Sequence, residues 1–211
     1  MYIPEPFRES DPDCLRAFMA ENNFATLVSG AETGPIATHL PLRLDCSAGP
    51  QGTLVGHMAR ANPHWREFES GTLVLAIFHG PHEYISPDWQ ISELALPTWN
   101  YVAVHVWARP TLIEDSQRVR QLLDDLVEAN ESGRPTPWPN DLPLEFRSKM
   151  ERAIVAFELS IERIEGKFKL SQNRPEADQQ GALEGLESER TGSELADLWK
   201  SRLKLPAAPG G

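Results

Sequence analysis

Hydrophobic positions along the chain fall in short runs that are rich in β-branched residues or alternate with polar ones. Such runs are typical of β-strands, whereas an amphipathic helix places apolar residues three or four positions apart. We predict strands at residues 24–29, 35–45, 52–60, 72–80, 101–113 and 152–171. A succession of short strands bounded by Gly, Pro or Asp favours an antiparallel barrel or sandwich.

Helical spacing of apolar residues occurs in residues 10–23, 115–130 and 193–203. The first of these begins with Asp11, which is suited to an N-cap, and Pro12, which is suited to the first helical position. Residues 133–143 contain too much proline for a helix or a strand and are expected to form a loop. The predicted fold is therefore mainly β with peripheral helices, in the α+β class.

The length of 211 residues suits one main core, and the sequence contains no internal repeat. We expect one domain over residues 1–175. Residues 176–211 have little apolar content before the last predicted helix, so they are expected to form a helical extension that ends in a frayed tail at 206–211.

The charge of the chain limits its partners. Lysine and arginine number 20 against 31 acidic residues, which gives a net charge of −11. Such a surface repels phosphate backbones, so direct nucleic-acid binding is disfavoured. Cys14 and Cys46 have no metal-site spacing, and the N-terminus does not join positive charge to a long apolar run. We expect a soluble, cytoplasmic protein without a membrane segment.

The first candidate binding segment is the strand-to-helix junction "GHMARANPHW". The predicted strand ends at Ala59 or Arg60. Asn62 is suited to an N-cap and Pro63 to the first position of a short helix. Free amides at a helix N-terminus beside an arginine can bind a phosphate, because both groups donate hydrogen bonds to its oxygens. The alternative is a capped helix with a surface arginine.

The second candidate segment is "IEGKFKLSQNR", residues 164–174. If it is extended, alternate residues share a face, and one face carries Lys167, Lys169, Ser171 and Asn173. These groups could bind an anion, or they could form a solvated strand edge that its lysines protect against aggregation. We expect Lys169 and Ser171 to contact the anion and Lys167 to face solvent.

Aromatic residues mark the segment "LPTWNYVAVHVWARP". In a strand, Tyr101, His105 and Trp107 share one face, and the valines between them share the other. The valines are expected in the core, which leaves the aromatic face for a ligand, for the core of another layer or for a dimer contact.

Other chemistries find little support. His79 and His82 are the closest histidine pair, but we expect a Gly-Pro turn between them and find no further ligand at a suitable spacing, so no metal site is predicted. A nucleophile elbow and a glycine-rich phosphate loop are also missing from the sequence.

Several segments together resemble the PaiB-like family, described as FMN-binding negative transcriptional regulators with a flavin-binding split β-barrel. The resemblance covers about the first 175 residues, and its segments are "MYIPEPF", "ATHLPL", "GHMARANPHW", "EYISP", "PTWNYVAVHVWA" and "IEGKFKLSQNR". Two positions depart from the family pattern. Gln90 stands where relatives often carry an aromatic residue, and Leu96 stands where valine is usual.

The resemblance implies an antiparallel split barrel that binds FMN between the subunits of a homodimer. The phosphate and ribityl chain would then be contacted by Arg60, Asn62, Lys169, Ser171 and Gln172. The ring and its polar edge would be lined by Thr38, His39, Leu40, His57, Met58 and Ala59. The second subunit would contribute Thr98, Trp99, Asn100 and Tyr101.

Three functions remain open at this point. The resemblance implies a flavin-dependent negative transcriptional regulator, although the charge favours regulation through a protein partner or a metabolite over direct DNA contact. A small FMN-dependent oxidoreductase using a nicotinamide or similar donor is the alternative, because the cofactor itself carries that chemistry. A haem-binding split barrel, with a histidine as axial ligand, is the second alternative.

Overall fold

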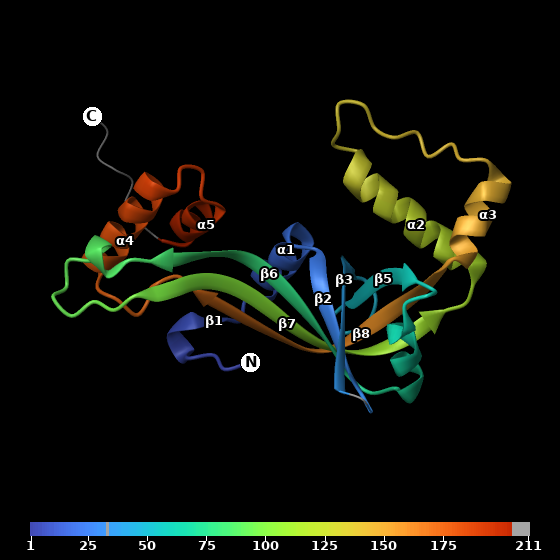
Figure 1. Cartoon of the computed structure of the whole chain (residues 1–211), viewed down its shortest axis with the longest axis horizontal. Helices are drawn as coiled ribbons and strands as arrows, with labels where there is room; N and C mark the ends of the chain where they lie inside the picture. Colours follow the sequence, from blue (N-terminus) through green and yellow to red (C-terminus); the bar gives the residue numbers. More distant parts are fainter. Residues whose placement is uncertain (33, 204–211) are drawn as a thin grey trace. The chain divides into compact units, whose positions relative to one another are not determined.

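The computed structural model of the chain describes residues 1–32 and 34–203 (Figure 1). The chain folds into two compact units. Unit 1 consists of Met1–Asp11, His79–Ala103 and Glu165–Gly211, and unit 2 consists of Pro12–Phe78 and Val104–Ile164. The tail predicted at 206–211 lies outside the described residues.

The strands form one sheet in the order β3-β2-β6-β7-β8-β5-β4, with β1 paired to β8. The strands are β1 (Arg8–Glu9), β2 (Phe24–Ala31), β3 (Gly34–Pro41), β4 (Arg43–Asp45), β5 (Thr53–Ala59), β6 (Val74–Ile85), β7 (Thr98–Ile113) and β8 (Ile154–Lys169). The pairs β1–β8, β2–β3, β2–β6, β4–β5 and β5–β8 are all antiparallel. The predicted mainly β, antiparallel fold is confirmed.

The Gly80-Pro81 turn predicted between His79 and His82 was wrong, because both residues lie inside β6. Strand β2 pairs with only the stretch Leu75–Ile77 of β6. Pro81 lies beyond that stretch, so its missing N–H removes no hydrogen bond to β2. The alternation predicted for β7 is confirmed, since its valines are buried and Tyr101 and His105 are half-buried.

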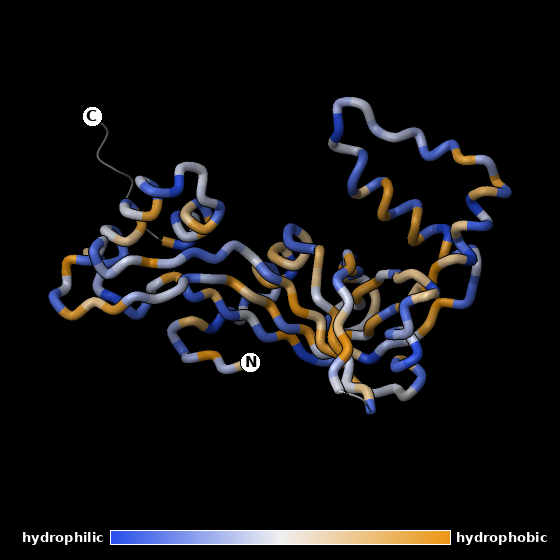
Figure 2. The backbone as a smooth tube through the Cα atoms, in the orientation of Figure 1, coloured by the Kyte–Doolittle hydropathy of each residue, from blue (hydrophilic) through white to orange (hydrophobic). Residues whose placement is uncertain are grey.

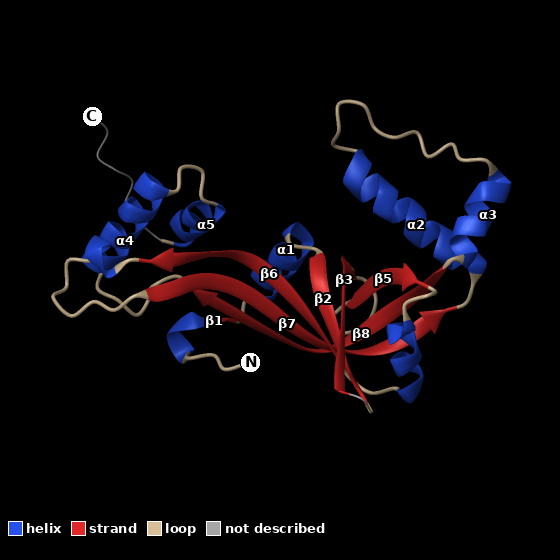
Figure 3. Ribbon diagram, viewed as in Figure 1, coloured by secondary structure: helices blue, strands red, loops and turns tan. Residues whose placement is uncertain are grey.

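Unit 2 also contains the helices α1 (Pro12–Glu21), α2 (Ser116–Glu131) and α3 (Leu144–Arg152), and the 3-10 helix η2 (Pro63–Ser70). Helix α1 starts at Pro12 as predicted, and Asp115 caps α2 by accepting hydrogen bonds from two backbone amides. Hydrophobic and hydrophilic positions alternate along α2, and a long loop joins it to α3 (Figures 2 and 3). The apolar side of α2 packs on the sheet, with Leu122 against Val55 and Ala156.

Unit 1 contains the 3-10 helices η1 (Glu5–Phe7) and η3 (Pro87–Trp89) and the helices α4 (Glu176–Glu189) and α5 (Glu194–Arg202). The helix predicted at 193–203 is α5, and the Ser193 side chain caps it. Residues 176–189 were placed in a helical extension, but α4 itself was not predicted because this stretch has little apolar content. Fully buried side chains of this unit include Ile85, Leu170, Leu183, Leu186 and Trp199.

Candidate functional site

The predicted site residues fall in both units. Unit 1 holds the group Thr98, Trp99, Asn100, Tyr101, Lys169, Ser171 and Gln172. Unit 2 holds the group Thr38, His39, Leu40, His57, Met58, Ala59, Arg60 and Asn62. The structure thus brings the start of β7 into the same unit as the end of β8.

A cavity of about 240 Å³ lies in unit 1 where these two strand ends meet, and we call it the Lys169 pocket. Its polar lining residues are Gln90, Thr98, Asn100, Lys169, Ser171, Asn173 and Arg174. Among the described residues that line it, two are cationic and none is acidic. One chain therefore supplies two of the residues predicted to bind a phosphate, Lys169 and Ser171, and two of those predicted to come from a second subunit, Thr98 and Asn100.

Lys169 is held in place at this pocket. Its ammonium group donates hydrogen bonds to the Thr98 hydroxyl and to the carbonyl oxygen of Trp99, the latter at 2.7 Å. Burial lowers the pKa of Lys169, and the nearby charges of Lys167 and Arg174 lower it further. An anion in the pocket would offset both effects, because it stabilises the charged ammonium.

Ser171 and Asn100 form the buried end of the pocket. Asn100 is fully buried, and its Nδ2 donates a hydrogen bond of 3.0 Å to Ser171 Oγ. The prediction that Ser171 continues the strand was wrong, because β8 ends at Lys169 and Ser171 has a left-handed backbone with φ of 60°. The Gln172 side chain closes the strand end, since it accepts from the Leu170 amide at 2.7 Å and donates to the Phe168 carbonyl.

The prediction that Lys167 faces solvent was also wrong, since only 8% of this residue is exposed. Its ammonium donates to the Tyr2 carbonyl at 3.2 Å and lies 5.1 Å from the centre of the Tyr101 ring. Lys167 therefore anchors the N-terminal segment within unit 1, and a cation–π contact replaces part of its lost hydration.

Residues of β6 and of the start of β7 form a second cavity in unit 1, of about 350 Å³, which we call the Trp99 cavity. It is lined by His79, Gly80, His82, Trp99, Tyr101 and Val102. Trp99 is 54% exposed, and its ring centre lies 6.0 Å from that of Tyr84. Because side chains alternate along a strand, Trp99 and Tyr101 point to the opposite face of β7 from Thr98 and Asn100.

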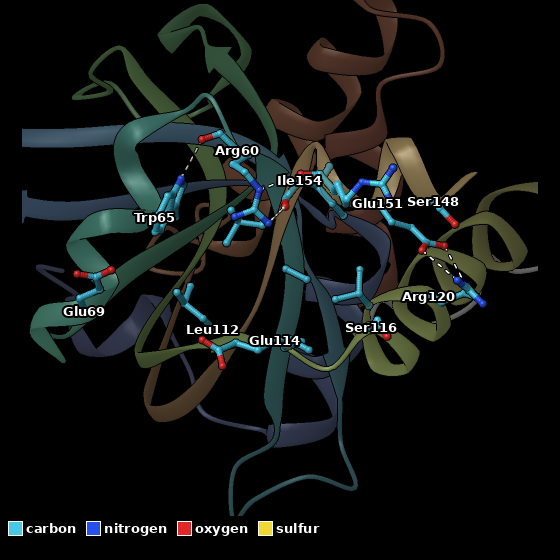
Figure 4. Close-up of a pocket in the computed structure, with 15 residues that line it drawn as sticks. Arg60, Trp65, Glu69, Leu112, Glu114, Ser116, Arg120, Ser148, Glu151 and Ile154 are labelled. Carbon is cyan, nitrogen blue, oxygen red and sulfur yellow. Dashed lines mark hydrogen bonds and ion pairs between the residues drawn. The ribbon is translucent and has the colours of Figure 1, made fainter. Parts of the chain in front are cut away.

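In unit 2 the structure confirms the predicted junction after β5. Asn62 caps η2 by accepting a hydrogen bond of 3.0 Å from the His64 amide, and Pro63 is the first residue of that helix. Arg60, however, already binds protein atoms. Its Nε and Nη2 donate to the carbonyl oxygens of Arg152 and Ile154, at 2.9 Å and 2.6 Å (Figure 4).

Arg60 lines a cavity of about 680 Å³, which we call the Arg60 cavity. Three arginines and three glutamates line it: Arg60, Arg120, Arg152, Glu69, Glu114 and Glu151. Arg120 holds Glu151 through two hydrogen bonds, of 3.0 Å and 3.1 Å (Figure 4), and these keep the pKa of Glu151 below its usual value. Balanced charge gives this cavity no preference for an anion.

A buried polar network in unit 2 joins Thr38 to residues that sequence reasoning missed. Asn62 Nδ2 donates to Thr38 Oγ1 at 3.0 Å, and Thr38 Oγ1 is hydrogen-bonded to His64 Nδ1 at 2.8 Å. The second ring nitrogen of His64 is hydrogen-bonded to Ser29 Oγ at 2.8 Å. Burial lowers the pKa of His64. The network fixes the N-terminus of η2 through a fully buried imidazole.

The remaining predicted residues of unit 2 differ in accessibility. Leu40 and Met58 are buried in the core, whereas His39 and Ala59 are exposed. His39 Nδ1 is hydrogen-bonded to Thr26 Oγ1 at 2.9 Å. The Nδ1 atom of His57 is buried without a hydrogen-bond partner in the described part of the chain, and burial lowers the pKa of His57. Their roles toward a ring stay predictions.

Comparison with known proteins gives consistent matches. Residues 1–163 match the family described as "Putative FMN-binding domain". "Protease synthase and sporulation protein PAI 2" of Bacillus subtilis is 36% identical, over 97% of this chain and 99% of that protein. An uncharacterized protein of Aspergillus fumigatus is 28% identical, over 89% of this chain and 91% of that protein.

Two solved structures are similar in fold. The flavocytochrome Anf3 of Azotobacter vinelandii superposes with a TM-score of 0.62 at 16% identity, over 77% of this chain and 69% of that one. The FAD and heme binding protein of Mycobacterium smegmatis gives a TM-score of 0.61 at 16% identity, over 84% and 80%. In the described residues, no helix is long and apolar enough to cross a membrane.

Proposed function

Because the chain belongs to the FMN-binding domain family and has the antiparallel split-barrel fold of flavin-binding proteins, we propose that it holds the phosphate of FMN in the Lys169 pocket. We further propose that the bound flavin serves a regulatory role that is exerted through a protein partner. The family match ends at residue 163, so four of the nine residues that line this pocket lie beyond the match.

The observation that carries the phosphate proposal is the positive charge of the residues that line the Lys169 pocket. Lys169 and Arg174 line it without an acidic neighbour in the described lining, and Ser171 and Asn100 add neutral polar groups. A phosphate accepts hydrogen bonds from all of these residue types, and those from charged donors are the strongest. The donor set therefore fits the phosphate of FMN.

FMN supplies hydride or electron transfer when it is bound. The protein's own part is to bind and orient it. Lys169 is kept directed at the pocket by its two hydrogen bonds to the start of β7, so little side-chain entropy is lost when an anion binds. The contacts predicted from Arg60, Asn62 and the other residues of unit 2 stay predictions.

A titration tests the phosphate site. FMN and riboflavin differ by the phosphate alone, so the dissociation constant of riboflavin divided by that of FMN measures what the phosphate contributes. We expect Lys169→Met to lower this ratio at least tenfold or so, as for the loss of a hydrogen bond to a charged group. Inorganic phosphate should compete with FMN for the wild-type protein. An unchanged ratio would remove the proposal.

The regulatory role is supported by the Bacillus relative, which is named a protease synthase and sporulation protein. The net charge of −11 opposes contact with a DNA backbone, so we propose a protein as the regulated partner. Deleting the gene should change the levels of particular transcripts. If regulation requires FMN, a strain that carries Lys169→Met should show the same changes in transcript levels as the deletion strain. Wild-type transcript levels with a variant that has lost FMN would refute it.

We also propose a homodimer. Large apolar side chains of unit 1 are exposed, among them Leu94, Leu96 and Trp99, and such a surface is typical of a contact with another chain. Light scattering on the FMN-loaded protein should give twice the monomer mass at micromolar concentration. A monomer with FMN bound would contradict the proposal.

The Trp99 cavity favours a second candidate function, that of a small FMN-dependent oxidoreductase. A cavity lined by Trp99, Tyr101 and two histidines suits a planar heterocycle, because such rings stack on aromatic side chains. Anaerobic mixing of the FMN-loaded protein with NADH or NADPH, followed by flavin absorbance, distinguishes this function. Rapid bleaching supports it, and a stable oxidised spectrum excludes these donors. A Soret band in the purified protein would instead support haem.

A further inference from the structure

The segment between β6 and β7 supplies one wall of the Lys169 pocket, through Gln90, Leu96 and Pro97. Gln90 is the polar residue of this wall. Its Oε1 atom is buried and has no hydrogen-bond partner among the residues that the structure describes. An amide oxygen in this state is costly unless a donor reaches it. A half-turn about the Cγ–Cδ bond exchanges the amide oxygen and nitrogen, so this position can either accept or donate a hydrogen bond.

Helix α4 holds this wall through Trp89. A Cβ atom at Gly185 would lie 2.2 Å from Trp89 Cγ, and one at Gly181 would lie 2.3 Å from the Trp89 carbonyl oxygen. Glycine in the middle of a helix costs roughly 0.5–1 kcal/mol relative to alanine. Two such glycines one turn apart are explained by the close approach of the residue that precedes Gln90.

Asp178 fixes the other side of Gln90. Its Oδ1 accepts hydrogen bonds from the backbone amides of Ile91 and Ser92, at 3.0 Å and 2.9 Å. Asp178 is 2% exposed, and the hydrogen bonds from Ser92 keep its pKa below the usual value. Gln90 therefore lies between two attachments to α4, one at Trp89 and one at Ile91.

We propose that Gln90 is a further binding residue of the Lys169 pocket, that it hydrogen-bonds a hydroxyl next to the bound phosphate, and that α4 is the element that positions it. This inference rests on the proposed function. An amide can accept a hydrogen bond from a hydroxyl or donate one to it. The pocket would then select a phosphorylated polyol, such as the ribityl phosphate of FMN, over a bare phosphate. Gln90 is one of the two positions that depart from the family pattern, and this inference gives it a role in binding.

The test compares FMN with inorganic phosphate on Gln90→Met, which keeps the size of the side chain and removes its amide. FMN is titrated by the quenching of its fluorescence, and phosphate is measured as a competitor. We expect FMN to bind about three- to tenfold more weakly, as for the loss of one neutral hydrogen bond, and phosphate to change by less than about twofold.

The positioning role of α4 is tested with Gly185→Ala, measured below its melting temperature. The added methyl displaces Trp89, so FMN should weaken by several-fold while phosphate changes little, as with Gln90→Met. Gly133→Ala is the matched control, because a Cβ at Gly133 meets no atom within 4 Å. A purely structural role would lower the melting temperature and leave the ratio of the two affinities unchanged. If Gly185→Ala does not fold, Gln90→Met decides alone.

The titrations of Gln90→Met and Lys169→Met together distinguish failure of the inference from failure of the proposed phosphate site. If Gln90→Met leaves FMN affinity unchanged while Lys169→Met weakens it, the inference about Gln90 is wrong and the phosphate site stands. If Gln90→Met weakens FMN and phosphate equally, the amide does not read a hydroxyl, and the inference is again wrong. If Lys169→Met leaves FMN affinity unchanged, the proposed phosphate site and the inference both fail.

Discussion

The Lys169 pocket and the Arg60 cavity both contain basic residues that the sequence marks as possible phosphate contacts, but their surroundings differ. Lys169 and Arg174 meet no carboxylate in the described lining of their pocket. The three arginines of the Arg60 cavity share it with three glutamates, and Arg60 itself binds two backbone carbonyls. The comparison teaches that a basic residue is better placed to bind an anion when no carboxylate lines the same cavity.

Replacing Lys169 should give the largest effect. Lys169→Met should weaken FMN by about 1.5–3 kcal/mol, because a hydrogen bond from a charged donor is lost. The loss should shrink at high salt. Lys167→Met is the matched control, two residues away on β8, and should lower the melting temperature while changing FMN affinity by less than about threefold. Equal losses of FMN affinity from the two substitutions, measured by fluorescence titration, would show that Lys169 has no special role in binding.

Overpacking the wall of the Lys169 pocket should give the second largest effect. Gly185→Ala should lower the free energy of unfolding by about 1–3 kcal/mol, because the new methyl overlaps the Trp89 ring. Gly133→Ala should have little effect. Urea unfolding of both variants measures the difference. Equal stability of the two would mean that α4 does not need the close contact with Trp89.

Arg60 should show a smaller effect of a different kind. Arg60→Ala removes two hydrogen bonds to the ends of α3 and β8, so we expect a loss of about 1 kcal/mol in stability and a smaller loss of FMN affinity than with Lys169→Met. Arg60→Lys keeps the charge but not the planar fork, and should leave most of the stability loss in place. A drop in FMN affinity that Arg60→Lys restores would show that Arg60 binds the phosphate.

The pH dependence of stability should give the smallest effect, and it arises in unit 2. Burial lowers the pKa values of His57 and His64 in the folded state. The unfolded chain therefore binds more protons as the pH falls below about 6.5, and stability decreases there. Above that pH both states are neutral at these residues, and their contribution is fully present. Urea midpoints at pH 7.5 and 5.5 test this, and His64→Gln should reduce the difference. A midpoint that rises on acidification would contradict it.

The sequence predicted those features that depend on local pattern. The strands follow from β-branched or alternating runs, the starts of α1 and η2 follow from Pro12, Asn62 and Pro63, and α2 and α5 follow from the spacing of their apolar residues. The end of β8 could not be read from alternation, because it depends on the left-handed backbone of Ser171 and the fold-back of Gln172.

Features set by contacts between residues distant in the sequence were missed, because local pattern carries no signal for them. Propensity argues against a helix that contains Gly181 and Gly185, and only the contact with Trp89 explains them. His64 gave no signal in the sequence that distinguishes a buried network from a surface residue. Of the candidate site, the Lys169 segment and the start of β7 were predicted separately, and only the structure places them around one cavity.

A crystal structure of the FMN complex tests the phosphate site most directly. We predict that phosphate oxygens lie within hydrogen-bonding distance of Lys169 Nζ and the Arg174 guanidinium. A phosphate bound at the N-terminus of η2 and the Arg60 guanidinium, with Lys169 still bound only to Thr98 and Trp99, would contradict the account.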